Sequence, residues 1–113
     1  MTIKEYQQYV EEGANPIYTQ QLALLGLVGE VGELSDVVKK QNIYSDMSRF
    51  EQKYGMTVKE KICDEAGDVL WQYMLVLCKY GLSIEDVIAC NVEKLNKRHG
   101  GAGRTASDGG GVR

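Results

Sequence analysis

The sequence has little of several residue types that would favour other kinds of protein. It holds one proline, one histidine and one phenylalanine among 113 residues. Apolar and polar residues nowhere alternate strictly, so the pattern does not favour β-strands. No apolar run is long enough to span a membrane, and no charged segment followed by an apolar one marks a secretory signal. We therefore expect a cytoplasmic protein without a membrane segment.

The cysteines and the net charge exclude further classes of protein. Cys63, Cys78 and Cys90 give an odd count and lack the C-x-x-C spacing of a zinc site. Because all three fall in helical patterns among apolar residues, we expect buried free thiols in a reducing compartment. A net charge of −3 gives no general attraction to nucleic acid or acidic membranes. A helical nucleic-acid binder would also need a basic stripe beyond the last predicted helix.

The remaining pattern predicts an all-α protein, a helical bundle of four to five helices. Thr2, Thr57 and Ser83 are suited to cap helix N-termini, and Gly13 and Gly81 to end helices. Pro16 fits the first turn of the next helix. We expect helices over 3–12, about 17–41, about 57–80 and 83–99, with 42–55 as a loop or a short helix.

Each of the two long helices carries an apolar stripe that we expect to be buried. The first stripe consists of Leu24, Leu27, Val28, Val31, Leu34 and Val38. The second consists of Ile62, Cys63, Ala66, Val69, Leu70, Tyr73 and Leu77. We expect one helical domain over 1–99, followed by a glycine-rich mobile tail over 100–113.

Two short motifs, GEVGE and DEAGD, place acidic residues in these otherwise apolar helices. Glu30 and Glu33 form the first pair, and Glu65 and Asp68 form the second. At about 100° of rotation per residue, both pairs lie at the same angle from the apolar stripe of their helix. The matched phase predicts that the four carboxylates converge on one partly buried site.

Four close carboxylates repel one another unless they are protonated or hold a cation. Mg²⁺ takes oxygen ligands, usually few carboxylates with water and phosphate oxygens, so four indicate more than one Mg²⁺ when substrate is bound. The simpler alternative is surface ion pairs with lysines such as Lys40 or Lys61. A di-iron bundle site would need Glu-x-x-His on two helices. The one histidine, His99, has Asn96 and not glutamate three positions before it, so this motif is absent.

Glycines accompany the acidic pairs. Each glycine in a helix interior costs about 1 kcal/mol relative to alanine. We expect close helix approach or ligand access to offset this cost at Gly26, Gly29, Gly32 and Gly67.

The last predicted helix carries a possible phosphate site. Asn91, Lys94 and Arg98 share one face of NVEKLNKRH, and Lys97 can join them from the side. A polar donor and several cations can hold phosphate. The alternative is a helix C-terminus whose cations merely suit the helix dipole.

Two aromatic residues follow the second acidic pair closely. Trp71 lies toward the acidic side of its helix and is a candidate for stacking on a nucleobase. The alternative for Trp71 is a core or subunit contact, and this alternative is favoured for Tyr73.

Together, the segments GEVGEL, DEAGDVLWQ and NVEKLNKRH resemble the MazG-type all-α nucleoside triphosphate pyrophosphohydrolases. That superfamily also includes dimeric dUTPases and dCTP pyrophosphatases. The resemblance covers roughly residues 17–99. Its motifs E-x-x-E, E-x-x-D and N-x-x-K-L-x-x-R match Glu30, Glu33, Glu65, Asp68, Asn91, Lys94, Leu95 and Arg98.

The resemblance implies hydrolysis of a nucleoside triphosphate between the α and β phosphates, giving a monophosphate and pyrophosphate for nucleotide pool control or house-cleaning. It implies Mg²⁺, which Mn²⁺ can replace, on the four acidic residues, with Glu30 or Glu33 as the candidate that activates water. Lys94 and Arg98 would neutralise phosphate charge. The site would be completed in a homodimer or a homotetramer.

The sequence departs from the family pattern in two places. Gly29 stands where many members have the first residue of a doubled acid, E-E-x-x-E, which leaves the number and geometry of metals open. Residues 42–54 contain no recognised motif, and substrate choice can reside there. The alternative function is an inactive helical interaction or assembly protein of the same fold. The intact set of four acids favours the enzyme.

Overall fold

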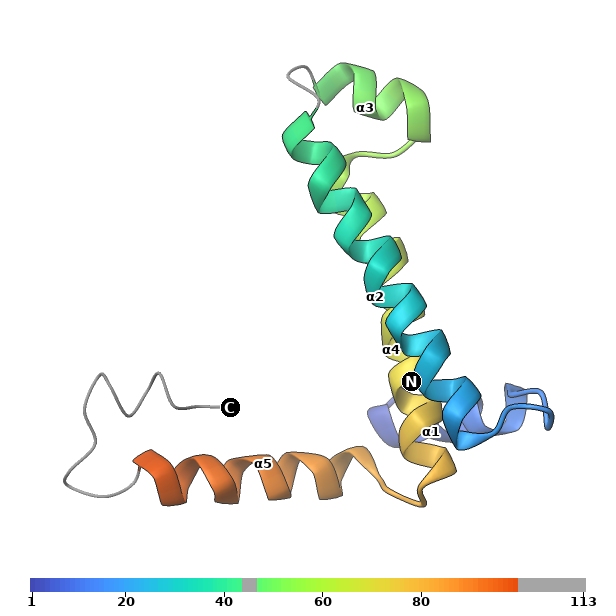
Figure 1. Ribbon diagram of the computed structural model, residues 1–113, viewed down its shortest axis with the longest axis vertical. Coiled ribbons are helices and arrows are strands. Elements are labelled where there is room, and N and C mark those ends of the chain that lie inside the picture. The colour runs from blue at the N-terminus through green and yellow to red at the C-terminus, as the bar shows by residue number, and fades with distance from the viewer. Residues whose placement is uncertain (44–46, 100–113) are drawn as a thin grey trace.

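The computed structural model describes residues 1–43 and 47–99. These residues form five helices and no strand, which confirms the all-α prediction (Figure 1). The predicted tail over 100–113 lies outside the described residues. The helices are α1 (Ile3–Gly13), α2 (Gln20–Ile43), α3 (Met47–Tyr54), α4 (Val58–Lys79) and α5 (Ile84–His99).

Thr2 and Thr57 cap the helices that the sequence predicted them to cap, and each does so in a capping box. The Thr2 hydroxyl accepts the backbone N–H of Glu5, and the Glu5 carboxylate accepts the backbone N–H of Thr2. Thr57 and Glu60 repeat this exchange at the start of α4. Reciprocal capping satisfies two backbone donors that the first helical turn leaves unpaired. In both boxes the hydrogen bonds to threonine lower the pKa of the glutamate.

Glycine ends α4, as predicted. Gly81 has φ of 68°, a left-handed conformation that costs glycine little and other residues more. The N–H groups of Gly81 and Leu82 donate to the carbonyls of Cys78 and Leu77. This Schellman arrangement turns the chain out of α4 and toward α5.

The helix α2 begins later than predicted, at Gln20 rather than about Ile17. The side chain of Asn15 accepts the N–H of Ile17, and its carbonyl accepts the N–H of Tyr18. These local hydrogen bonds hold the residues after Pro16 in a turn instead of a helix.

An antiparallel hairpin of α2 and α4 forms the body of the molecule (Figure 1). The short helix α3 packs on the end of the hairpin where α2 finishes, and α1 packs on α4 near the other end. The α5 helix contacts α1 and extends away from the hairpin. The centre of the α2–α4 contact therefore lies between α3 at one end of the hairpin and α1 at the other.

An aromatic pair within α3 lies where this helix meets the hairpin. Phe50 is fully buried, and its ring lies 4.7 Å from that of Tyr54 between centroids. The ammonium groups of Lys40, Lys53 and Lys61 lie 5.5, 5.5 and 5.6 Å from the centre of the Tyr54 ring. Cation–π contacts of this kind hold α2, α3 and α4 together at this end.

The main core lies at the other end, where α1 crosses the hairpin. Its buried residues are Val10, Ala23, Met74, Leu75 and Leu77. Half-buried side chains that pack against this cluster include Tyr6, Tyr18, Trp71, Ile84 and Val87. The core therefore joins α1 to the two long helices and reaches the start of α5.

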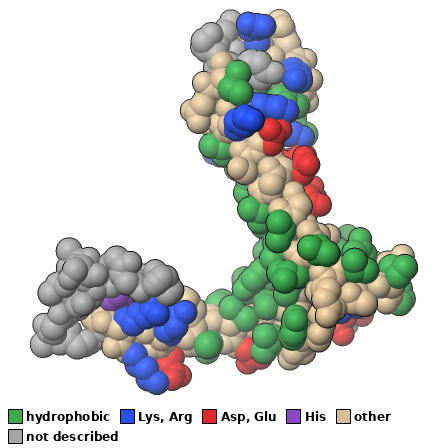
Figure 2. All heavy atoms as spheres, in the orientation of Figure 1, with side chains coloured by type: hydrophobic (Ala, Val, Ile, Leu, Met, Phe, Trp, Pro, Cys, Tyr) green, Lys and Arg blue, Asp and Glu red, His purple; other side chains and the backbone are tan. Residues whose placement is uncertain are grey.

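The predicted burial of the apolar stripe on α2 is wrong for the single chain. Val28 is 63% exposed, and Leu24, Val31 and Val38 are also exposed. Leu70 and Cys63 of the α4 stripe are exposed too. The buried residues of α2 are instead Ala23 and Val37, which lie on the side that carries the acidic residues. Figure 2 shows the exposed hydrophobic side chains along the hairpin.

The predicted burial of the cysteines is also mostly wrong. Cys63 and Cys90 are exposed, and Cys78 is half-buried. All three are free thiols, as expected. Burial raises the pKa of the Cys78 thiol, which disfavours the thiolate form.

The α5 helix is held at its start, where Ile84 and Val87 pack against the main core. The Gln7 carboxamide donates to the Leu82 carbonyl at 2.7 Å and accepts the N–H of Ile84 at 3.1 Å. Ser83 and Asp86 form a third reciprocal cap. No residue of α5 is buried. Among the described helices, none is long and apolar enough to cross a membrane.

The glycines of the hairpin have different surroundings, which leads to a stability prediction. A Cβ at Gly26 would lie 2.6 Å from the Gln72 side chain, whereas Gly32 has open space. We expect Gly32→Ala to raise the free energy of unfolding by up to about 1 kcal/mol because alanine favours the helix. Gly26→Ala should gain less, since the Gln72 carboxamide must move. Urea denaturation of both variants measures the difference, and an equal gain would contradict the contact.

Candidate functional site

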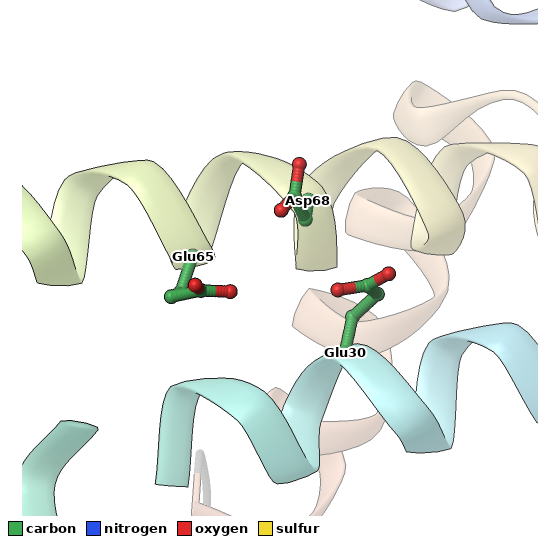
Figure 3. A group of neighbouring side chains, drawn as sticks. All are labelled: Glu30, Glu65 and Asp68. Atoms are coloured by element: carbon green, nitrogen blue, oxygen red, sulfur yellow. The ribbon is translucent and has the colours of Figure 1, made fainter. Parts of the chain in front are cut away.

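Three carboxylates from the two long helices meet at the centre of the hairpin. Glu30 projects from α2 toward α4, which carries Glu65 and Asp68 one turn apart (Figure 3). One carboxylate oxygen from each lies within 4.8 Å of the others. The predicted convergence of the two acidic motifs therefore occurs for these three residues.

The helical periodicity explains this meeting. Glu65 and Asp68 are three residues apart, so they lie on neighbouring turns of the same face of α4. That face packs on α2, where Glu30 occupies the corresponding position. Each carboxylate is thus fixed by a regular helix and not by a loop, which gives the group a defined geometry.

The site carries more negative charge than its surroundings offset. Glu65 is buried and 9% exposed, Glu30 is half-buried, and Asp68 is exposed. Burial raises the pKa of Glu30, and the negative charges of Asp68, Glu65 and Glu33 raise it further. Bringing an ionised Glu30 to this position therefore costs free energy that a cation would recover.

Lys61 supplies part of the missing positive charge. Its ammonium lies 3.2 Å from Glu65 and 3.6 Å from Asp64. The hydrogen bond to Glu65 is the largest cause of a raised pKa at Lys61. The ion pair considered as the simpler alternative is thus present at Glu65. Lys40 instead pairs with Asp36 at 2.8 Å.

Glu33 lies outside the group of three. Its side chain is exposed, and the close approach of oxygens does not include it. Its charge still contributes to the raised pKa of Glu30. A role for Glu33 as a metal ligand or as the residue that activates water stays a prediction.

The predicted phosphate-binding residues all lie on α5. Asn91, Lys94, Lys97 and Arg98 are exposed, and Lys97 pairs with Glu93 at 3.3 Å. Because α5 extends away from the hairpin (Figure 1), one chain does not bring these cations to its own carboxylates. Their phosphate-binding role stays a prediction.

The aromatic candidate, Trp71, is half-buried and packs against the main core. Tyr73 packs there as well, as predicted. The part of Trp71 that remains exposed leaves base stacking as a prediction.

Sequence reasoning missed two neighbours of the carboxylates. Asp68 contributes to a raised pKa of Tyr6 on α1, although burial and Tyr9 contribute more. Gln72 lies one turn beyond Asp68 and contacts Gly26 on α2. Pattern alone places Gln72 on the acidic side of α4, but the contact depends on how the two helices pack.

The arrangement is suited to a hard divalent cation. The three side chains offer only carboxylate oxygens, which Mg²⁺ prefers over softer ligands. Burial and the neighbouring negative charges raise the pKa of Glu30, and a cation at this position would offset both effects. Both observations fit a metal ion that bridges the two helices.

Comparison with known proteins identifies the family of the chain. Residues 18–101 match the family model of the MazG nucleotide pyrophosphohydrolase domain. The chain is also 33% identical over 72 residues to the uncharacterized protein YvdC of Bacillus subtilis (strain 168). That match covers 64% of this chain and 68% of YvdC. No solved structure gives a significant match. Since the family model spans most of the sequence, the chain belongs to the MazG nucleotide pyrophosphohydrolase domain family.

Proposed function

We propose that this protein is a Mg²⁺-dependent nucleoside triphosphate pyrophosphohydrolase. The observation that carries the proposal is the meeting of Glu30, Glu65 and Asp68 at the centre of the α2–α4 hairpin. Membership of the MazG family supports a nucleotide substrate. Water attacks the α-phosphorus, the bond from that phosphorus to the bridging oxygen breaks, and the products are a monophosphate and pyrophosphate.

The residues of the hairpin hold the metal in this proposal. Glu30, Glu65 and Asp68 would hold it, with Glu33 on the next turn of α2 as the fourth candidate ligand. When bound, Mg²⁺ or Mn²⁺ would polarise the phosphate and lower the pKa of water. Glu30 or Glu33 accepts the proton of the attacking water. Lys61 orients the Glu65 carboxylate through their ion pair.

The residues of α5 neutralise the phosphates. Lys94 and Arg98, with Lys97 and Asn91 beside them, offer cations and a donor to the charge that moves onto pyrophosphate. Because α5 extends away from its own hairpin, the α5 helix of a second copy must complete the site. The protein acts as a homodimer or a homotetramer.

Two features of the single chain support this assembly. The apolar stripe on α2, with Val28 at 63% exposure, lies open on the hairpin in the described part of the chain. The α5 helix has no buried residue, although isolated helices of its length are marginal in water. A second copy would cover both.

The reaction is tested by product analysis. The purified protein is incubated with each common NTP and dNTP, with Mg²⁺ or with a chelator, and the products are separated. We expect a monophosphate and pyrophosphate from at least one nucleotide, only with Mg²⁺.

Two variants test the residues of the site. Glu65→Gln should abolish turnover with the fold intact, because it removes a proposed metal ligand. Lys94→Ala should weaken catalysis more than folding. Full activity of Glu65→Gln would refute the site, and a protein that neither binds metal nor forms product would be an assembly protein.

Metal binding is tested by thermal unfolding. We expect Mg²⁺ at a hundredfold excess over its Kd to stabilise the protein by about 2.7 kcal/mol, and Glu30→Gln to lose most of this response. In chelator near neutral pH, Glu30→Gln should be the more stable form, because it lacks an ionised carboxylate with a raised pKa. That advantage should shrink as the pH falls toward the pKa of Glu30, which lies above its usual 4.5.

The matched control for this measurement is Glu51→Gln. Glu51 is exposed on α3, away from the three carboxylates, so its substitution should leave the Mg²⁺ response unchanged. An equal Mg²⁺ response in Glu30→Gln and the wild type would contradict the metal site.

Completion of the site by a second copy is tested by mixing two inactive variants. In a dimer of one Glu65→Gln chain and one Lys94→Ala chain, one of the two sites has intact carboxylates and an intact partner α5. Random pairing should therefore restore about a quarter of wild-type activity. If α5 serves its own chain, mixing restores nothing, because each site then keeps one defect.

A further inference from the structure

The carboxamide of Gln72 lies between α4 and α2, about one helical turn from the carboxylates. A Cβ at Gly26 would lie 2.6 Å from the Gln72 Oε1 atom and 3.1 Å from Nε2. Gly29, Gly32 and Gly67 have no such neighbour. The absence of a side chain at Gly26 is therefore what lets this carboxamide lie against α2.

The Gln72 carboxamide is not fully satisfied in this position. Its Oε1 atom is buried and has no hydrogen-bond partner in the described chain. The Gln7 carboxamide, by contrast, uses both its oxygen and its nitrogen to fix the start of α5. A buried acceptor without a donor is unfavourable, so Gln72 has a hydrogen bond to gain by turning toward a ligand.

The position of Gln72 relative to the metal site indicates which part of a nucleotide it would meet. Gly26 is four residues before Glu30, and Gln72 is four residues after Asp68, so the contact lies about one helical turn, or 5.4 Å, from the carboxylates. Lys61 lies one turn to the other side, four residues before Glu65. Lys61 is paired with Asp64 and Glu65, but it is a cation, and phosphates call for a cation whereas a nucleoside does not. The β and γ phosphates therefore suit the Lys61 side, which directs the nucleoside toward Gln72.

We propose that Gln72 is a specificity-determining residue whose carboxamide, resting on Gly26 in the free protein, hydrogen-bonds the nucleoside part of the substrate. This inference rests on the proposed function. A neutral group with one acceptor and two donors suits the sugar hydroxyls and the edge of a base, whereas a phosphate calls for a cation. The sugar and the base share this hydrogen-bonding chemistry, and the experiment separates them.

The test compares nucleotides on Gln72→Leu, which keeps much of the volume and removes the hydrogen-bonding atoms. In the full-length protein with Mg²⁺, kcat/KM is measured for the best substrate, for its ribose or deoxyribose counterpart, and for the other bases. We expect discrimination to fall about tenfold or more with the Mg²⁺ stabilisation unchanged. A change in the ribose to deoxyribose ratio identifies the sugar, and a change among bases identifies the base.

Two further variants separate a specific role from a structural one. Gln41→Leu, at an exposed position of α2, should leave discrimination unchanged. Gly26→Ala, which displaces the carboxamide but keeps the glutamine, should alter discrimination, while Gly32→Ala should not. If Gln72→Leu has too little activity to compare, the Kd values of the corresponding monophosphates give the same ratios.

The contrary outcomes are distinct. A uniform loss of kcat/KM for every nucleotide would overturn the proposal, since it would make Gln72 a spacer between the helices. Unchanged discrimination would overturn it as well. A wild-type protein that hydrolyses no nucleotide would refute the proposed function itself, and this inference with it.

Discussion

The antiparallel packing of α2 on α4 is the constraint on which the rest of the structure depends. It turns the acidic side of each helix inward, so that Glu30 meets Glu65 and Asp68. Carboxylates in such a seam contribute repulsion where apolar side chains would contribute burial. The main core lies at the α1 end of the hairpin and Phe50 is buried at the α3 end, while the three carboxylates lie at its centre.

The helices and their ends could be predicted because they depend on short-range interactions. Thr2 and Thr57 cap through residues three positions away, and Gly81 ends α4 through its own backbone conformation. The start of α2 was missed because Asn15 competes for the backbone of the next turn. Local hydrogen bonds of this kind are visible in the sequence only as a tendency of asparagine to form turns.

The packing of the helices could be predicted less well, for a physical reason. Periodicity identifies the apolar side of α2, but it does not say whether α4 or another chain covers that side. Val28 and Val31 are exposed in the single chain, and the side toward α4 is the one with Glu30. The acidic motifs gave the better guide, because matched phase on two helices constrains where both must face. The contact of Gln72 with Gly26 depends on the helix separation, which no sequence pattern encodes.

In the proposed function, the asymmetry of the site along the hairpin gives a bound nucleotide a direction. On one side of the three carboxylates, Lys61 adds positive charge and pairs with Glu65. On the other side, Gln72 offers a neutral carboxamide with an unpaired acceptor. A triphosphate and a nucleoside differ in the same two respects, charge and hydrogen-bonding capacity. In the proposed function, a single pair of packed helices therefore specifies both the position of the metal and the orientation of the substrate, and the α5 helix of a second copy supplies the cations for the phosphates.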